Sequence, residues 1–178
     1  MSFSLHPSSI SPDEYDDWYG AYLRNCGEKE LISWLDELKT ETLSFFEERS
    51  DEWLRFAYDS GKWTPLDLLG HLADTELIFA MRLLCVLRHE TSPIPGFDQD
   101  RYVLHQPVET LGCTHLLRRF ESARDQTLLL CEELNDSNAS RILIADGHDM
   151  SARALVGVIA GHNKHHLNVL KERYILPQ

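Results

Sequence analysis

Basic residues are scarce in this chain of 178 residues. It carries 17 lysines and arginines against 29 aspartates and glutamates, which gives a net charge of −12 at pH 7 with histidine neutral. A surface of that charge repels the phosphates of nucleic acids and the anionic headgroups of membranes. We therefore expect neither nucleic acid nor a membrane as a partner.

Long hydrophobic runs are also missing, and no apolar stretch reaches the roughly 20 residues that a membrane-spanning helix needs. Residues 1–5 lack the basic region and apolar block of a secretion signal. The chain has four cysteines, Cys26, Cys85, Cys113 and Cys131, and no two of them form a Cys-x-x-Cys pair. Three of the four lie in apolar tracts of helical character. Buried free thiols in a cytoplasmic protein are the expectation.

Convincing strand patterns are absent as well, which leaves helices to build the fold. Apolar residues recur at three- and four-residue intervals, as on one face of a helix, in four long segments. These segments are residues 28–49, 65–89, 109–134 and 151 to between Tyr174 and Pro177. Helices of this length, each with one apolar face, pack most simply as a four-helix bundle. The predicted fold class is all-α.

A short additional helix is predicted ahead of the bundle, over residues 13–24. We accordingly divide the chain into an N-terminal extension, residues 1–27, and the bundle, residues 28–178. The extension carries an aromatic stripe that we interpret as packing against the main body, namely Tyr15, Trp18, Tyr19 and Tyr22.

One long irregular stretch, residues 91–108, separates the second and third bundle helices and contains three prolines. Such a loop is either a lid or binding segment, or a rigid crossover held by its prolines. It permits helices that are not strictly up-down-up-down. A second connection, residues 141–150, contains a turn signal at Asp146-Gly147 and is expected to lie flat over one end of the bundle.

Histidines supply the candidate chemistry. His162 and His166 lie four residues apart on the inward face of the last helix, so both side chains can reach one atom. His71 falls among the apolar residues of the second bundle helix and is a candidate third ligand. Inward-facing imidazoles must be satisfied by hydrogen bonds or by a metal. Both explanations remain open at this point, and His165 is also within reach of His162.

Four motifs surround these histidines: GKWTP at 61–65, LGHLAD at 69–74, PGFDQD at 95–100 and AGHNKHH at 160–166. In this order and spacing they resemble the DinB-like superfamily, including its YfiT-type metal-dependent hydrolases, from about Leu31 onward. The resemblance implies a four-helix bundle that holds a divalent metal through His71, His162 and His166. It implies that His165 turns toward a helix interface or solvent.

Three imidazole ligands leave one coordination position open, as in catalytic zinc sites. Zinc or nickel is favoured, and iron or manganese would also accept imidazole. Position 163 is asparagine, so the His-Glu-x-x-His arrangement with its own general base is absent. Asp74, three residues after His71, is the candidate for a base or for a carboxylate that orients an imidazole. A solvated surface position is the simpler interpretation of this carboxylate and of the weaker candidates Glu76, Asp98 and Asp100.

The resemblance implies two reactions and one role without catalysis. The first is hydrolysis, in which water activated by the metal attacks an amide or ester of a small molecule. The second is S-transfer from a low-molecular-weight thiol such as bacillithiol or mycothiol, which needs no protein base. The third is a stress-response module in which the metal only staples the bundle. Relatives that pair, together with exposed aromatic residues in the extension, favour a homodimer.

Overall fold

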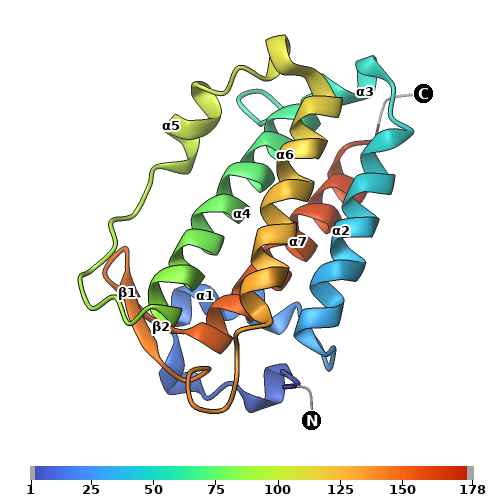
Figure 1. Ribbon diagram of the computed structural model, residues 1–178. Helices are drawn as coiled ribbons and strands as arrows, with labels where there is room; N and C mark the ends of the chain where they lie inside the picture. Colours follow the sequence, from blue (N-terminus) through green and yellow to red (C-terminus); the bar gives the residue numbers. More distant parts are fainter. Residues whose placement is uncertain (1–2, 176–178) are drawn as a thin grey trace.

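Four long helices that run side by side dominate the computed structural model, which describes residues 3–175 (Figure 1). They are α2 (Leu31–Glu47), α4 (Pro65–Leu87), α6 (Val108–Cys131) and α7 (Ala152–Arg173). The predicted four-helix bundle is confirmed. The last helix ends at Arg173, and Pro177, the latest end expected for it, lies outside the described residues.

The helices are not arranged up-down-up-down. Both α6 and α7 contact α2 and α4, so α2 and α4 lie at opposite corners of the bundle. In Figure 1, α4 and α6 run down the view, whereas α2 and α7 run up. Because α4 and α6 are parallel neighbours, the chain between them must return along the outside of the bundle. The predicted long crossover between these two helices is confirmed.

The sequence predicts an irregular crossover throughout, but part of the crossover is helical. The crossover contains a short helix, α5 (Gln99–Leu104). The carboxylate of Asp98 caps the start of this helix by accepting a hydrogen bond from the amide of Arg101 at 3.0 Å. A four-residue helix, α3 (Asp51–Leu54), likewise lies between α2 and α4. Helices of one or two turns are too short to show a hydrophobic period, so they could not be recognised from the sequence.

Residues 142–151 form a β-hairpin, and the expectation of a chain without strands was wrong here. β1 (Ile142–Ala145) pairs antiparallel with β2 (His148–Ser151) at one end of the bundle (Figure 1). The turn residues Asp146 and Gly147 have φ angles of 57° and 78°. Positive φ at both central residues is typical of two-residue hairpin turns. The turn signal was therefore sound, but strands of four residues are too short for a clear alternation.

The N-terminal extension packs on the bundle. After two single-turn 3-10 helices, η1 (Pro7–Ser9) and η2 (Pro12–Glu14), helix α1 (Asp17–Arg24) lies along α7. Two glycines permit this approach: a Cβ at Gly161 would overlap the carbonyl of Tyr22, and one at Gly157 would meet Leu23. The extension also contributes apolar side chains to the bundle core, among them Leu5, Ile10, Tyr19 and Leu23.

Helices α4 and α7 begin close to the predicted positions, directly after the capping residues Thr64 and Ser151. The Thr64 hydroxyl accepts a hydrogen bond from the amide of Asp67 at 3.1 Å, and the Asp67 carboxylate accepts one from the amide of Thr64 at 2.9 Å. The Ser151 hydroxyl likewise accepts from the amide of Ala154 at 3.0 Å. These caps fix the starts of α4 and α7, the two helices that carry the candidate histidines.

The four cysteines are free thiols, of which Cys26 and Cys131 are buried and Cys85 and Cys113 are half-buried. No described helix is long and apolar enough to cross a membrane.

Candidate metal centre

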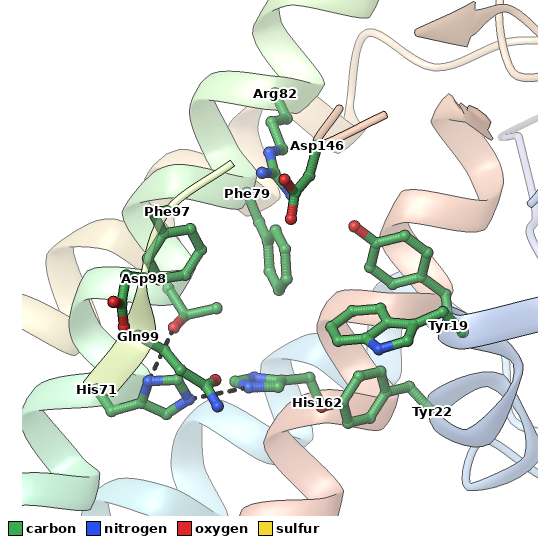
Figure 2. A pocket seen from close by; sticks show the side chains of 12 residues that line it. Tyr19, Tyr22, His71, Phe79, Arg82, Phe97, Asp98, Gln99, Asp146 and His162 are labelled. Atoms are coloured by element: carbon green, nitrogen blue, oxygen red, sulfur yellow. Dashed lines mark hydrogen bonds between the residues drawn. The ribbon is translucent and has the colours of Figure 1, made fainter. Parts of the chain in front are cut away.

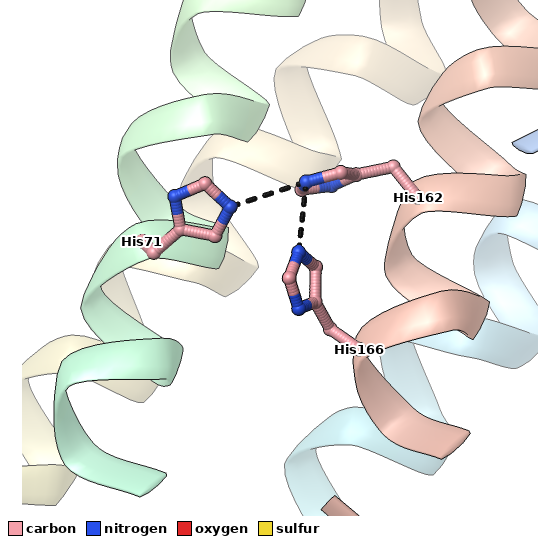
Figure 3. Close-up of side chains that lie close together, drawn as sticks. All are labelled: His71, His162 and His166. Carbon is pink, nitrogen blue, oxygen red and sulfur yellow. Dashed lines mark hydrogen bonds between the residues drawn. The ribbon is translucent and has the colours of Figure 1, made fainter. Parts of the chain in front are cut away.

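Three histidines from two helices converge between α4 and α7 (Figure 3). The Nε2 atoms of His71 and His162 are 3.2 Å apart, and those of His166 and His162 are 3.1 Å apart. Among the described residues, these three form a group whose possible ligand atoms all lie within 4.8 Å of one another. The three histidines singled out in the sequence therefore meet at one point.

The nitrogen separations suit a shared metal ion. Ligands at about 2.0 Å from a tetrahedral zinc are about 3.3 Å from one another. A neutral imidazole nitrogen carries either one proton or one lone pair, so Nε2 of His162 cannot satisfy both of its neighbours by hydrogen bonds. A cation at the common point would satisfy three lone pairs at once. The donor set thus fits a divalent metal better than a cluster of core histidines.

Burial keeps these imidazoles neutral. His71 and His162 are buried and His166 is half-buried. Loss of solvation lowers the pKa of His71 to about 4, against a smaller rise from the charge of Asp74. Loss of solvation also holds the pKa values of His162 and His166 well below the ordinary range, and the neighbouring histidines lower these two further. Metal ligation requires this deprotonated form.

Aromatic rings and one hydroxyl hold the imidazoles in place. The ring of Trp63 lies 4.9 Å from that of His71, and the ring of Tyr22 lies 5.3 Å from that of His162, measured between centroids. The hydroxyl of Thr75, one turn after His71, is 3.3 Å from Nδ1 of His71. Because this contact fixes which ring nitrogen faces the centre, Thr75 orients the imidazole of His71.

His165 lies outside the cluster. It is exposed, and its ring packs against Tyr22 at 5.8 Å between centroids. The expectation that it turns toward solvent or a helix interface agrees with this position.

Two of the three histidines, His71 and His162, line a pocket of about 270 Å³ between α1, α4 and α7 (Figure 2). Its walls include three aromatic residues of α1, namely Trp18, Tyr19 and Tyr22, together with Phe79 of α4. The interpretation of the α1 aromatic stripe as packing alone was therefore incomplete, because 63% of the Trp18 surface is exposed beside the pocket. Residues 97–99 of the crossover and Asp146 of the hairpin turn complete the rim.

A model of the DinB superfamily matches residues 35–170 of the sequence. The chain belongs to the DinB superfamily. This confirms the resemblance carried by the four motifs, and it places all three converging histidines within the matched region.

Curated relatives carry a name that refers to a metal. A protein of Oceanobacillus iheyensis named "putative metal-dependent hydrolase" is 26% identical over 147 residues, which cover 80% of this chain and 84% of the relative. A protein of the same name from Bacillus licheniformis is 25% identical over 149 residues, covering 81% and 85%.

The solved structure of YfiT from Bacillus subtilis has the same fold. It is described as "a probable metal-dependent hydrolase with an unusual four-helix bundle topology", and it superposes with a TM-score of 0.72 at 21% identity, covering 80% of this chain and 82% of YfiT. At this identity the match establishes the fold alone.

Asp74, the candidate base, is bound on both carboxylate oxygens. Oδ1 accepts a hydrogen bond from Nη2 of Arg119 at 2.6 Å, and Oδ2 accepts one from Nε2 of Gln106 at 3.0 Å. Its side chain lines a separate surface hollow with Arg101 and Tyr102. The structure thus does not bring Asp74 into the pocket with the histidines.

The weaker carboxylate candidates fall in three different places. Glu76 is buried and paired with Arg124, so its interpretation as a solvated residue was wrong. Asp98 is exposed at the rim of the histidine pocket, and Asp100 is exposed on the other side of His166. Of the four carboxylates considered from the sequence, Asp98 is the one that lines the pocket.

Two pocket residues of α4 were not singled out in the sequence, Thr75 and Arg82. They follow His71 at intervals of four and eleven residues, which place them on the same helix face. That spacing was a usable signal once His71 had been chosen. The residue from the hairpin turn, Asp146, carried no such signal because its position depends on the fold.

Proposed function

We propose that this protein is a metal-dependent hydrolase of a small molecule, with His71, His162 and His166 as ligands of one divalent metal. The observation that carries the proposal is the convergence of three imidazole nitrogens at one point, with two of the rings, those of His71 and His162, in the wall of a pocket. Zinc or nickel is the favoured ion, and iron or manganese is compatible with the same donors. When bound by three imidazoles with a position open, such an ion supplies a Lewis acid that activates water.

The remaining pocket residues bind the substrate and handle protons. The aromatic walls from α1 and α4 exclude water and contact apolar parts of a substrate. Asp98 is placed at the rim, where a carboxylate can accept a proton. A base role for Asp74 stays a prediction, because it would require that carboxylate to leave Arg119 and Gln106.

A second candidate function is S-transfer with a low-molecular-weight thiol of the bacillithiol or mycothiol kind. The observation that favours it is the pairing of Asp74 with Arg119, which removes the expected base, since a thiolate needs none. The protein's own cysteines do not line the pocket. Burial also raises the pKa values of Cys26 and Cys131 to about 12, so the attacking sulfur would come from the co-substrate.

A direct test compares the protein loaded with zinc, nickel, iron(II) or manganese on a panel of carboxylic esters and amides. Monochlorobimane with added low-molecular-weight thiols tests S-transfer in parallel. His162→Ala removes one proposed ligand, and His165→Ala is the matched control on the same helix.

Metal-dependent hydrolysis that His162→Ala abolishes and His165→Ala keeps would support the hydrolase. Loss of the electrophile only in the presence of thiol would favour the S-transferase instead. If neither reaction occurs and the metal resists exchange and inhibitory anions, both enzymatic proposals fail and the metal serves as a structural staple. Homodimer formation and a cytoplasmic location remain predictions, checked by light scattering and by fractionation of the source cells.

A further inference from the structure

A second polar group is buried in the same pocket, away from the histidines. Arg82 of α4 has only 3% of its surface exposed, and its Nε has no hydrogen-bond partner. Among the described residues Arg82 takes part in no salt bridge, and the acidic residue that faces it, Asp146, is exposed at the pocket rim. A buried charge without a counter-ion is costly to the fold. Such a group in a pocket wall is typical of a site that receives its counter-ion from a ligand.

Arg82 and His71 mark two ends of one helix face. His71, Thr75, Phe79 and Arg82 follow one another at intervals of four, four and three residues. Eleven residues of α-helix correspond to about 16 Å along the axis between the first and last Cα atoms. The ring of Phe79 lies between, with its centroid 5.8 Å from Cζ of Arg82 and 5.8 Å from the ring of His162. The pocket therefore has a cation, an apolar wall and two of the three histidines, His71 and His162, in succession.

The groups that face Arg82 come from two other elements, α1 and the hairpin turn (Figure 2). Tyr19 of α1 turns its hydroxyl oxygen toward the guanidinium, and burial raises the pKa of this hydroxyl more than Arg82 lowers it, so the hydroxyl stays neutral. Asp146 of the turn is exposed at the rim. The pocket also has a second acidic side chain at its rim, Asp98, and the whole chain carries a charge of −12. One arginine among these negative charges suits a monoanion better than a phosphate dianion.

We infer that Arg82 binds a carboxylate of the substrate, whose apolar or aromatic middle lies along Phe79 and Trp18 and whose reacting group lies at the histidines. A guanidinium binds a carboxylate through two parallel hydrogen bonds, a geometry that a lysine cannot reproduce. The placement of the reacting group rests on the proposed function. Carboxylate binding itself is a property of Arg82 and does not depend on turnover.

The test uses two probes of equal shape, 4-phenylbutanoate and its neutral amide, 4-phenylbutanamide. Their affinities for the full-length protein as purified are measured by titration calorimetry. We expect the wild type to bind the acid at least about tenfold more tightly than the amide, the size of one charge-assisted contact. Arg82→Gln is expected to reduce this preference to less than about twofold, and Arg82→Lys to keep part of it.

Two further variants separate Arg82 from other sources of the preference. Arg88→Gln removes one positive charge near the end of the same helix, from an exposed pair with Glu133, and should leave the preference unchanged. His162→Ala removes a proposed metal ligand and tests whether the acid binds at the metal instead of at Arg82. A preference that His162→Ala abolishes and Arg82→Gln keeps would show the acid bound to the metal, and it would overturn the inference.

Equal affinities of the wild type for acid and amide, or no binding of either, would overturn the inference without any variant. Circular dichroism and thermal melting establish that Arg82→Gln is folded. Failure of the proposed function appears separately, as a wild type without metal or without hydrolysis. The acid preference can persist in that case, because it is read from binding alone.

Discussion

Arg124 of α6 donates two hydrogen bonds to the carboxylate of Glu76 on α4, each at 2.7 Å, and both side chains are buried. The same guanidinium donates to the carbonyl of Leu35 on α2 at 2.8 Å and to Oδ1 of Asn163 on α7 at 3.2 Å. One side chain therefore joins all four bundle helices. Because Asn163 is adjacent to His162, this network also fixes the part of α7 that presents the candidate ligands.

Glu76→Gln is expected to destabilise the bundle strongly. The change leaves a buried guanidinium without its counter-charge, which costs about 3–5 kcal/mol of the free energy of unfolding. Urea denaturation followed by circular dichroism measures the loss. Glu37→Gln is the matched control, since Glu37 is exposed and pairs with the exposed Lys29. A loss of similar size in both variants would contradict the role of the network.

Gly161→Ala should displace α1 from α7. The added Cβ would overlap the backbone carbonyl of Tyr22, which cannot move without the helix, and overpacking of this kind costs about 1–3 kcal/mol. Thermal melting measures the loss, and tryptophan fluorescence reports the displacement of Trp18 beside the pocket. Gly157→Ala is the comparison, because the atoms nearest to its added Cβ belong to side chains, those of Leu23, Ile10 and Leu31, and not to the backbone. A smaller effect at Gly161 than at Gly157 would show that α1 is not held by backbone contact.

Acid should loosen the N-terminal extension. Burial raises the pKa of Glu14, but hydrogen bonds from Arg153, Ser151 and the amide of Ser11 lower it more, so the net pKa lies below the ordinary value. The stabilisation is fully present above about pH 4.3, the unfolded value, and is lost as the pH falls through the folded pKa.

This pH dependence is measured by thermal melting of the wild type and Glu14→Gln between neutral and acidic pH. The difference in melting temperature between the two proteins should shrink as the pH falls, because the variant has no carboxylate to protonate. A difference that stays constant at all pH values would show that the ion pair of Glu14 with Arg153 does not stabilise the fold.

The two carboxylate candidates for a base are separable by mutation. Asp98 lies at the pocket and Asp74 is held by Arg119, so Asp98→Asn is expected to lower hydrolysis about 10²-fold or more and Asp74→Asn far less. Steady-state rates with the metal-loaded protein provide the comparison, with metal content measured for each variant. The reverse order would restore Asp74 as the base.

The sequence predicted the bundle because its helices are long enough to repeat their apolar period several times. Two histidines four residues apart on one helix could be placed on a common face from their spacing alone. That His71 lies beside them could not be derived from spacing, because it depends on which helices pack together. The short elements α5, β1 and β2 could not be predicted, since four to six residues do not establish a period. Glu76 was misplaced for a related reason: burial of a charged residue depends on a partner, Arg124, that lies 48 residues away.

Metal content is the most direct test of the proposed three-histidine metal site. Tag-free protein purified without chelators is measured by mass spectrometry for the wild type and for His71→Ala, His162→Ala, His166→Ala and His165→Ala. We expect close to one divalent metal per chain in the wild type and in His165→Ala, and little or none in the other three variants. A wild type that contains no metal and cannot be reloaded would contradict the proposed metal site. An unchanged metal content in His162→Ala would contradict it as well.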